Sequence, residues 1–198
     1  IPMDGDGEDR PEEINNFIDQ ISNSNGKTIV GERVKRSEDL IFKTCYQLHK
    51  LITLTFTGKS IKFGNFTCLP KSTVEKMIKD KATWSSFSGA LTKVEKNRKV
   101  SPSTRGTRYF GPSKMNFLNL VKHSLAIIAV FKVNVIFRAA LFYAIYLYLI
   151  SSNITYITLI PLGLIIVFII SVLTLSKRED LNALNDSTNN LASFDKIK

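Results

Sequence analysis

The chain begins with an acidic stretch, IPMDGDGEDRPEE, in which one residue separates Asp4 from Asp6 and Glu8 follows. Carboxylates at this spacing can bind one divalent cation. Three interpretations are open: a solvated acidic segment, a calcium-binding loop, or half of a metal-dependent active site. The first needs no function, because acidic residues ahead of a helix are favoured by the helix dipole.

The calcium interpretation fails on spacing. A helix–loop–helix calcium loop needs glycine at its sixth position and glutamate at its twelfth. Counted from Asp4, those positions hold Asp9 and Asn15. In the active-site interpretation, the two aspartates hold a cation that bridges the phosphates of a nucleotide sugar and stabilises the departing diphosphate. An Asp-x-Asp pair by itself does not decide between this chemistry and a solvated segment.

A long apolar run lies in the C-terminal half. Residues 139–175 carry no charge, and one span of a bilayer needs only about 20 apolar residues. Extended to residues 133–175, with Arg138 reaching the interface, the run predicts a two-helix transmembrane hairpin that turns at Ser151–Asn153. The alternative is a pair of buried helices in a soluble protein. Basic residues flank both ends of the run, which predicts that both ends are cytoplasmic.

The residues next to the hairpin predict a further helix. In residues 115–132 the apolar positions recur at helical spacing, namely Phe117, Leu118, Val121, Leu125 and Ile128. This pattern is typical of an amphipathic helix in the membrane interface, although a core helix has the same period. Residues 176–198 are predicted to be a cytoplasmic tail, either a helix end or a disordered segment. Their Asn and Ser content favours disorder.

Residues 1–114 are predicted to form a cytoplasmic α/β segment with too few strands to stand alone. Helices are expected over 11–24, 37–57, 70–80 and around 84–93, with β structure in KTIVGER and KFGNFTCL. The stretch NRKVSPSTRGTRYFGPSK predicts a loop. Although the net charge is +10, the basic residues are scattered and no aromatic residues alternate with them, so nucleic acid is not an expected partner.

Read in chain order, five segments resemble one known family. They are MDGDGEDRPEEI, IVGERVKR, FGNFTCLPKSTVEKM, TRGTRYFGPSK, and the interfacial helix with its hairpin. They are similar to the family 2 glycosyltransferases that act on polyprenyl phosphates, such as dolichyl-phosphate mannose synthase and its undecaprenyl-phosphate relatives. The resemblance implies that residues 1–114 are the C-terminal part of a GT-A-like (Rossmann-like) catalytic domain. It also implies that the nucleotide-binding half is missing and that this chain alone is inactive.

The resemblance also implies a donor site. Asp4 and Asp6 would bind Mg²⁺ or Mn²⁺ and the donor diphosphate as catalytic residues. Glu8 stands where the family usually has glutamine, and would lie near the metal as a further ligand. The donor phosphates would be steadied by a basic wall, with the arginine at the end of the predicted strand as its main member and two weaker candidates: Arg33, Arg36 and Lys43.

An acceptor site is implied by the loop before the hairpin. Arg108, Gly111, Ser113 and Lys114 match the family's Arg-x-x-Gly-x-Ser-Lys pattern, which would clamp the lipid phosphate. The alternative is simple attraction to anionic lipid headgroups. Asn65, a further candidate catalytic residue by the resemblance, takes a place where some members carry an aspartate that could act as a base. A strong base is not required, because a phosphate acceptor is already largely deprotonated near neutral pH.

The function implied by the resemblance is that of a multi-pass hexosyltransferase of the cytoplasmic (inner) membrane. It would transfer a sugar from a nucleotide-diphosphate sugar to a polyprenyl phosphate at the cytoplasmic face, in cell-envelope glycan biosynthesis. Homo-oligomerisation is left open. The alternative is a non-enzymatic two-span membrane protein with a cytoplasmic interaction domain, whose acidic start has no chemical role.

Overall fold

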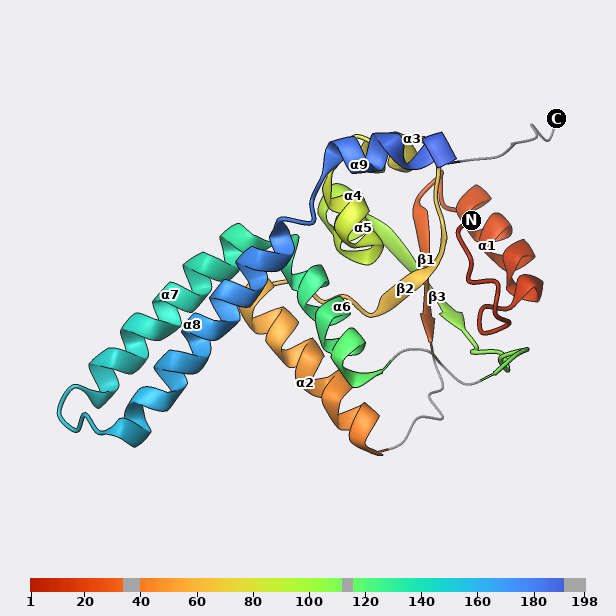
Figure 1. Ribbon diagram of the computed structural model, residues 1–198. Helices are drawn as coiled ribbons and strands as arrows, with labels where there is room; N and C mark the ends of the chain where they lie inside the picture. Colours follow the sequence, from red (N-terminus) through yellow and green to blue (C-terminus); the bar gives the residue numbers. More distant parts are fainter. Residues whose placement is uncertain (34–39, 112–115, 191–198) are drawn as a thin grey trace.

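The computed structural model describes residues 1–33, 40–111 and 116–190. Its centre is a mixed three-stranded sheet in the order β2-β1-β3 (Figure 1). The central strand β1 (Thr28–Arg33) pairs antiparallel with β2 (Phe63–Cys68) and parallel with β3 (Arg98–Ser103). The prediction of a mixed α/β fold is therefore confirmed.

The third strand corrects the prediction of a continuous loop over residues 97–114. Strand β3 contains only one apolar residue, Val100, and it contains Pro102, so its sequence gives little strand signal. Proline is tolerated because β3 is an edge strand. The inward-facing side chains are small, since Ser101 and Ser103 are buried. Gln20 Nε2 donates a hydrogen bond to Ser101 Oγ at 2.8 Å and attaches the strand to the neighbouring helix.

Helices cover both faces of the sheet. On one face lies α1 (Ile14–Ser22), preceded by the short 3-10 helix η1 (Pro11–Glu13), and its Phe17 ring packs 4.6 Å from Phe66. The other face is covered by α3 (Lys71–Met77), α4 (Ala82–Ser85), α5 (Phe87–Val94) and the end of α6 (Phe117–Ala129). The helices expected over 11–24 and 70–80 are confirmed with shorter bounds, and the helix expected around 84–93 is present as two short helices, α4 and α5.

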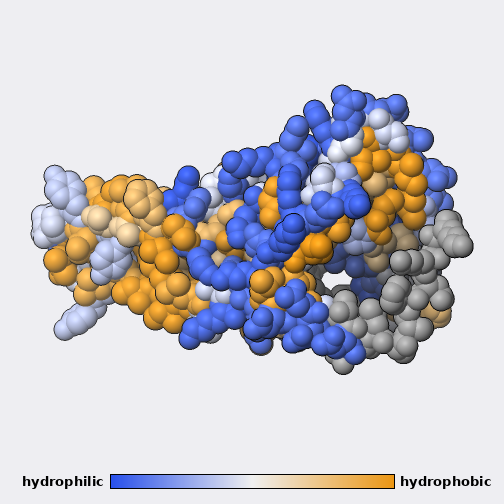
Figure 2. Space-filling view, turned by 90° about the horizontal axis from the view of Figure 1, so that it is seen from above, coloured by the Kyte–Doolittle hydropathy of each residue, from blue (hydrophilic) through white to orange (hydrophobic). Residues whose placement is uncertain are grey.

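Two long apolar helices project from this α/β part (Figure 1). They are α7 (Lys132–Ile150) and α8 (Tyr156–Ser176), and both are long and apolar enough to cross a membrane. Thr155 starts α8 with a reciprocal cap, in which its hydroxyl accepts a hydrogen bond from the Thr158 backbone N–H. Most of their apolar side chains are exposed, as the hydrophobic surface on the left of Figure 2 shows. A helix pair from a soluble core would bury them.

Helix α2 (Leu40–Thr57) is attached to the start of the hairpin. The last carbonyl groups of a helix have no partner within it. In α2, the Thr57 carbonyl oxygen accepts a hydrogen bond from Asn134 Nδ2 at 3.3 Å, and the Thr55 carbonyl oxygen accepts one from Arg138 at 3.0 Å. A cation at this end of a helix is also favoured by the helix dipole. Arg138 thus joins α2 to α7. Ser37, the predicted start of α2, lies outside the described residues.

The chain after the hairpin returns to the α/β part. It forms α9 (Leu181–Asp186) and the 3-10 helix η2 (Ser187–Asn190), and α9 lies against α4 at the top of Figure 1. At the base of the hairpin, Lys132 Nζ lies 3.0 Å from the Glu179 carboxylate, whose side chain is only 4 % exposed. The expectation of disorder is therefore wrong for the described part of the tail.

Candidate functional site

The acidic opening (residues 4–9) folds against the arginine loop (residues 104–109), which directly follows β3. The backbone N–H groups of Tyr109 and Gly106 donate to the carbonyl oxygens of Asp6 and Glu8, at 2.9 and 2.8 Å. Glycine is needed where the backbones meet, because a Cβ on Gly106 would lie 2.2 Å from the Gly7 carbonyl oxygen. Two segments far apart in the sequence are therefore fixed in register.

Glu8 is the centre of this contact. Its carboxylate is largely buried and faces three guanidinium groups: Arg108 Nη2 at 2.8 Å, Arg33 Nη1 at 3.7 Å, and Arg105, which is also hydrogen-bonded to it. Burial alone would raise the pKa of Glu8. The hydrogen bonds and charges of Arg105 and Arg108 outweigh that effect and hold the pKa below its ordinary value. Glu8 is thus an ionised anchor for the arginine loop.

The three aspartates of the acidic opening have different surroundings. Asp6 Oδ2 lies 3.0 Å from Arg108 Nη1, and its other oxygen accepts the Glu8 backbone N–H at 3.0 Å. Asp4 Oδ1 accepts a hydrogen bond from Asn65 Nδ2 at 3.4 Å.

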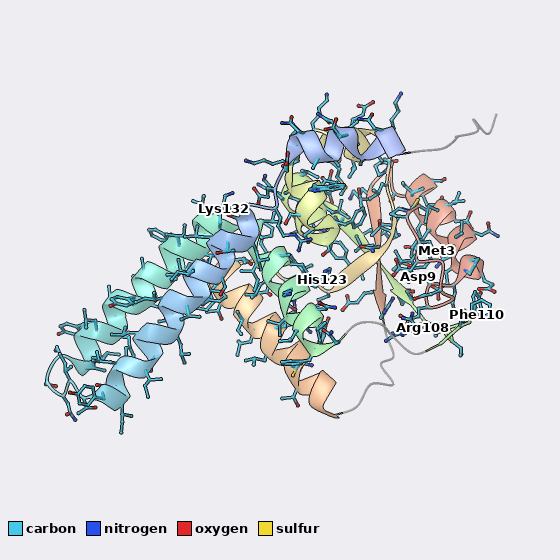
Figure 3. All side chains as sticks on the ribbon, viewed as in Figure 1. Met3, Asp9, Arg108, Phe110, His123 and Lys132 are labelled. Carbon is cyan, nitrogen blue, oxygen red and sulfur yellow. The ribbon has the colours of Figure 1, made fainter. Side chains whose placement is uncertain are left out.

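The buried Asp9 pairs with Arg33 Nη2 at 3.3 Å and also accepts the Asp4 N–H. Figure 3 shows Asp9 and Arg108 close to Met3 and Phe110, beside α1.

The sheet explains why these residues meet. Arg33 ends β1, and the arginine loop leaves the end of β3, which runs parallel to β1. The carboxyl ends of parallel neighbours lie at one edge, and ligands of open α/β sheets bind at such an edge. The structure therefore gathers the predicted residues Asp4, Asp6, Glu8, Arg33, Asn65 and Arg108. It adds two that the sequence analysis missed, Asp9 and Arg105.

Whether these carboxylates could bind a metal ion depends on their burial and on the partners that they already have. Asp4 is exposed and Asp6 half-buried, and two such carboxylates suit Mg²⁺ when substrate phosphates supply further oxygens. Glu8 fits less well, because it is buried and binding a metal would take its oxygens away from three arginines, whereas Asp6 is half-buried and would give up its contact with Arg108. Among the residues with described coordinates, no three His, Cys, Asp or Glu side chains are grouped to hold a metal ion. Asp4 and Asp6 remain the candidate ligands.

Other predicted site residues are only partly described. Arg36, Ser113 and Lys114 lie outside the described residues, and Lys43 lies in the first turn of α2, where only the backbone is described. Gly111 is exposed and has a φ of +62°, a left-handed conformation that favours glycine. Of the side chains predicted for a donor wall and an acceptor clamp, the structure therefore describes those of Arg33 and Arg108.

An open hollow borders the arginine loop. It has a volume of about 430 Å³ and is lined by Gly7, Arg10, Pro11 and Glu12 together with the four residues from Gly106 to Tyr109. Neither Asp4 nor Asp6 lines it. The hollow and the candidate metal ligands thus lie at different places along the contact between the acidic opening and the arginine loop.

His49 and His123 lie outside this cluster, on α2 and α6. Burial lowers the pKa of both; the charge of His123 lowers that of His49 further, and the charge of Arg178 lowers that of His123. His49 Nδ1 lies 3.4 Å from the Thr53 hydroxyl. Both rings are therefore uncharged at neutral pH.

We expect the contact between α2 and α6 to weaken in acid. Because the folded-state pKa of each histidine is lowered, the unfolded state binds protons more readily, and stability falls as pH drops below the ordinary value of 6.5. Amide hydrogen exchange in α2 and α6 should accelerate between pH 7.5 and 5.5, after correction for intrinsic exchange. In the His49→Gln/His123→Gln variant this extra acceleration should vanish. An unchanged pH dependence in that variant would contradict the assignment.

In comparisons with protein-family models, curated protein sequences and solved structures, nothing matched this chain.

Proposed function

We propose that this protein is a membrane-bound glycosyltransferase that transfers a sugar from a nucleotide-diphosphate sugar to a polyprenyl phosphate. One observation carries the proposal: the motifs that resemble this family, although far apart in the sequence, meet at one edge of the sheet. Asn65 contacts Asp4, Arg33 contacts Glu8, and Arg108 lies 3.0 Å from Asp6. A donor site and an acceptor clamp must be adjacent for direct transfer.

In the proposed reaction, an oxygen of the lipid phosphate attacks the anomeric carbon of the sugar. The bond from that carbon to the diphosphate breaks, and the configuration inverts. No proton has to be removed, because the acceptor phosphate is already ionised. A divalent cation held by Asp4 and Asp6 would supply positive charge to the departing diphosphate.

Arg108 is the proposed acceptor-binding residue. In the structure it is shared between Asp6 Oδ2 at 3.0 Å and Glu8 Oε1 at 2.8 Å. Arginine binds carboxylates and phosphates with the same planar pair of N–H donors, so a lipid phosphate can replace one of these partners. Glu8 keeps the guanidinium near the site until the phosphate arrives. The exposed apolar hairpin would hold this edge near the bilayer, on the cytoplasmic side.

The proposal is tested with the full-length protein in membranes that contain polyprenyl phosphate, supplied with a panel of nucleotide sugars. Sugar transfer to lipid should need Mg²⁺ or Mn²⁺, stop with EDTA, and fall at least about 100-fold in Asp6→Asn, since electrostatic stabilisation of a leaving group is a large contribution. The control is Asp19→Asn, an exposed aspartate on α1, which should transfer at the wild-type rate.

The geometry also fits a second candidate, a non-enzymatic two-span membrane protein with a cytoplasmic interaction domain. The observation in its favour is that Asp6, Glu8 and Asp9 are all paired with arginines, which is a sufficient reason for a purely structural cluster. If a folded and inserted protein transfers no sugar from any donor, this candidate takes precedence.

A further inference from the structure

Helix α2 has apolar side chains both on the side that packs against the protein and on an adjoining exposed stripe. Its inner side, with Ile52 and Phe56, packs against the cluster formed by α6, α7 and α8. Its outer side carries three leucines at helical spacing, Leu48, Leu51 and Leu54, whose exposed fractions are 55, 61 and 51 %. Single exposed leucines are ordinary on a protein surface, but three on one helical stripe mark a surface that is covered by something.

The position of α2 indicates what covers this leucine stripe. The C-terminal end of α2 is attached to the first turns of α7 by Arg138, and Phe56 lies 5.7 Å from Phe142 of the hairpin. From there α2 runs across the direction of the hairpin rather than along it, on the side of α6 that faces away from the sheet (Figure 1). The stripe therefore starts where the apolar surface of the hairpin begins.

The charges near the stripe favour an anionic lipid surface. Neither α2 nor α6 contains an acidic residue, whereas Lys50 and Lys122 lie on them and Lys59 follows α2. Basic residues beside an apolar helix face are attracted to anionic headgroups.

We propose that α2 lies on the membrane surface, with Leu48, Leu51 and Leu54 inserted at the boundary between headgroups and acyl chains. The inference depends only on the hairpin spanning the membrane, not on the proposed reaction.

This changes the role expected for α6. Residues 126–129 at the end of α6 are buried in the core. Apolar side chains are exposed only in its first turns, where Phe117 is 54 % and Leu118 is 68 % exposed. Helix α6 therefore connects the sheet to the interface, while α2 provides the larger lipid contact. The arginine loop precedes α6 in the chain, so two surface helices would fix the height of the candidate site above the bilayer.

Tryptophan fluorescence tests the proposal, because the chain has a single tryptophan, Trp84. That side chain is 46 % exposed on α4, which Figure 1 places away from the hairpin, so the wild-type protein is the reference for a water-exposed position. The test variants are Leu51→Trp and Leu48→Trp, each combined with Trp84→Phe. All proteins are reconstituted in vesicles of phosphatidylcholine and phosphatidylglycerol.

Tryptophan at positions 48 and 51 should be quenched by lipids carrying nitroxide on the acyl chain, and should be at least about twofold less sensitive to aqueous acrylamide than Trp84. A further control is Ile78→Trp with Trp84→Phe, since Ile78 is 55 % exposed, as Leu48 is, but lies at the end of α3. It should behave like Trp84. Far-UV circular dichroism checks that each variant is folded.

Two results would overturn the proposal. Acrylamide quenching at positions 48 and 51 equal to that of Trp84 would show that the stripe faces water. Protection from both quenchers would show that protein covers the stripe, as expected for contact with a second copy of the chain.

Discussion

Replacing Glu8 by glutamine is expected to lower the free energy of unfolding of the α/β part by about 2–4 kcal/mol, because the change removes a largely buried carboxylate that three arginines share. Glu8 contacts Arg33, Arg105 and Arg108, whose side chains are 31, 25 and 25 % exposed. Some of the loss is recovered when water reaches these arginines, so the effect lies below that of a fully buried pair. Thermal unfolding in detergent measures the change.

The matched control is Glu12→Gln. Glu12 also pairs with an arginine, Arg10, but at 3.6 Å and with its side chain 72 % exposed. An exposed pair of this kind contributes less than about 1 kcal/mol, so this variant should unfold almost as the wild type does. Equal effects of the two substitutions would mean that Glu8 is not the anchor of the arginine loop.

The lowered pKa of Glu8 also makes its contact with the arginine loop depend on pH. Because its folded-state pKa is lowered, the stabilisation is present at neutral pH and is lost as pH falls below the ordinary value of 4.5. Hydrogen exchange of the arginine loop should therefore accelerate below that pH in the wild type. In Glu8→Gln the exchange should be fast at every pH.

The helices could be predicted because their signals are local. Apolar residues recur at helical spacing around Phe17 and Leu91, and the run from residue 139 to 175 has no charge, so the positions of α1, α5 and the hairpin follow from short windows of sequence. Strand β3 could not be found in this way. It is a short edge strand with a proline, and only its pairing with β1 defines it.

Six residues that the sequence indicates do meet in the structure, but their pairing with one another could not be predicted. The motif order indicated Asp6, Glu8 and Arg108, yet it assigned Glu8 to a metal and Arg108 to a lipid phosphate, whereas the structure pairs them with each other. This contact joins residues far apart in the sequence, and the parallel arrangement of β1 and β3 brings them together. The sequence did contain one indication of this contact, since GDGED and TRGTR carry opposite charges around Gly7 and Gly106.

The apolar faces of α2 and α6 show a different limit of sequence patterns. A helical period identifies an apolar face but not the neighbour that covers it. For α6 the neighbour is mainly the protein core, and for α2 both a core face and a leucine face exist. Only the three-dimensional arrangement separates these two cases.

Gly106→Ala is expected to separate the arginine loop from the acidic opening. The new Cβ would lie 2.2 Å from the Gly7 carbonyl oxygen, a backbone atom that no side-chain rotation can move away. The loop must shift, and the hydrogen bonds from the Gly106 and Tyr109 N–H groups to the opening are lost. Overpacking of this kind costs about 1–3 kcal/mol, and the broken hydrogen bonds add to it.

The control for this variant is Gly5→Ala, in the same acidic segment, where an added Cβ meets no atom within 4 Å. It should unfold as the wild type does, since the new methyl group points into open space. If the proposed reaction is correct, sugar transfer should be lost in Gly106→Ala and kept in Gly5→Ala, because only the first moves Arg108 away from Asp6. Identical unfolding temperatures for the two variants would contradict the close approach of the backbones, and transfer that survives in a destabilised Gly106→Ala would remove Arg108 from the acceptor site.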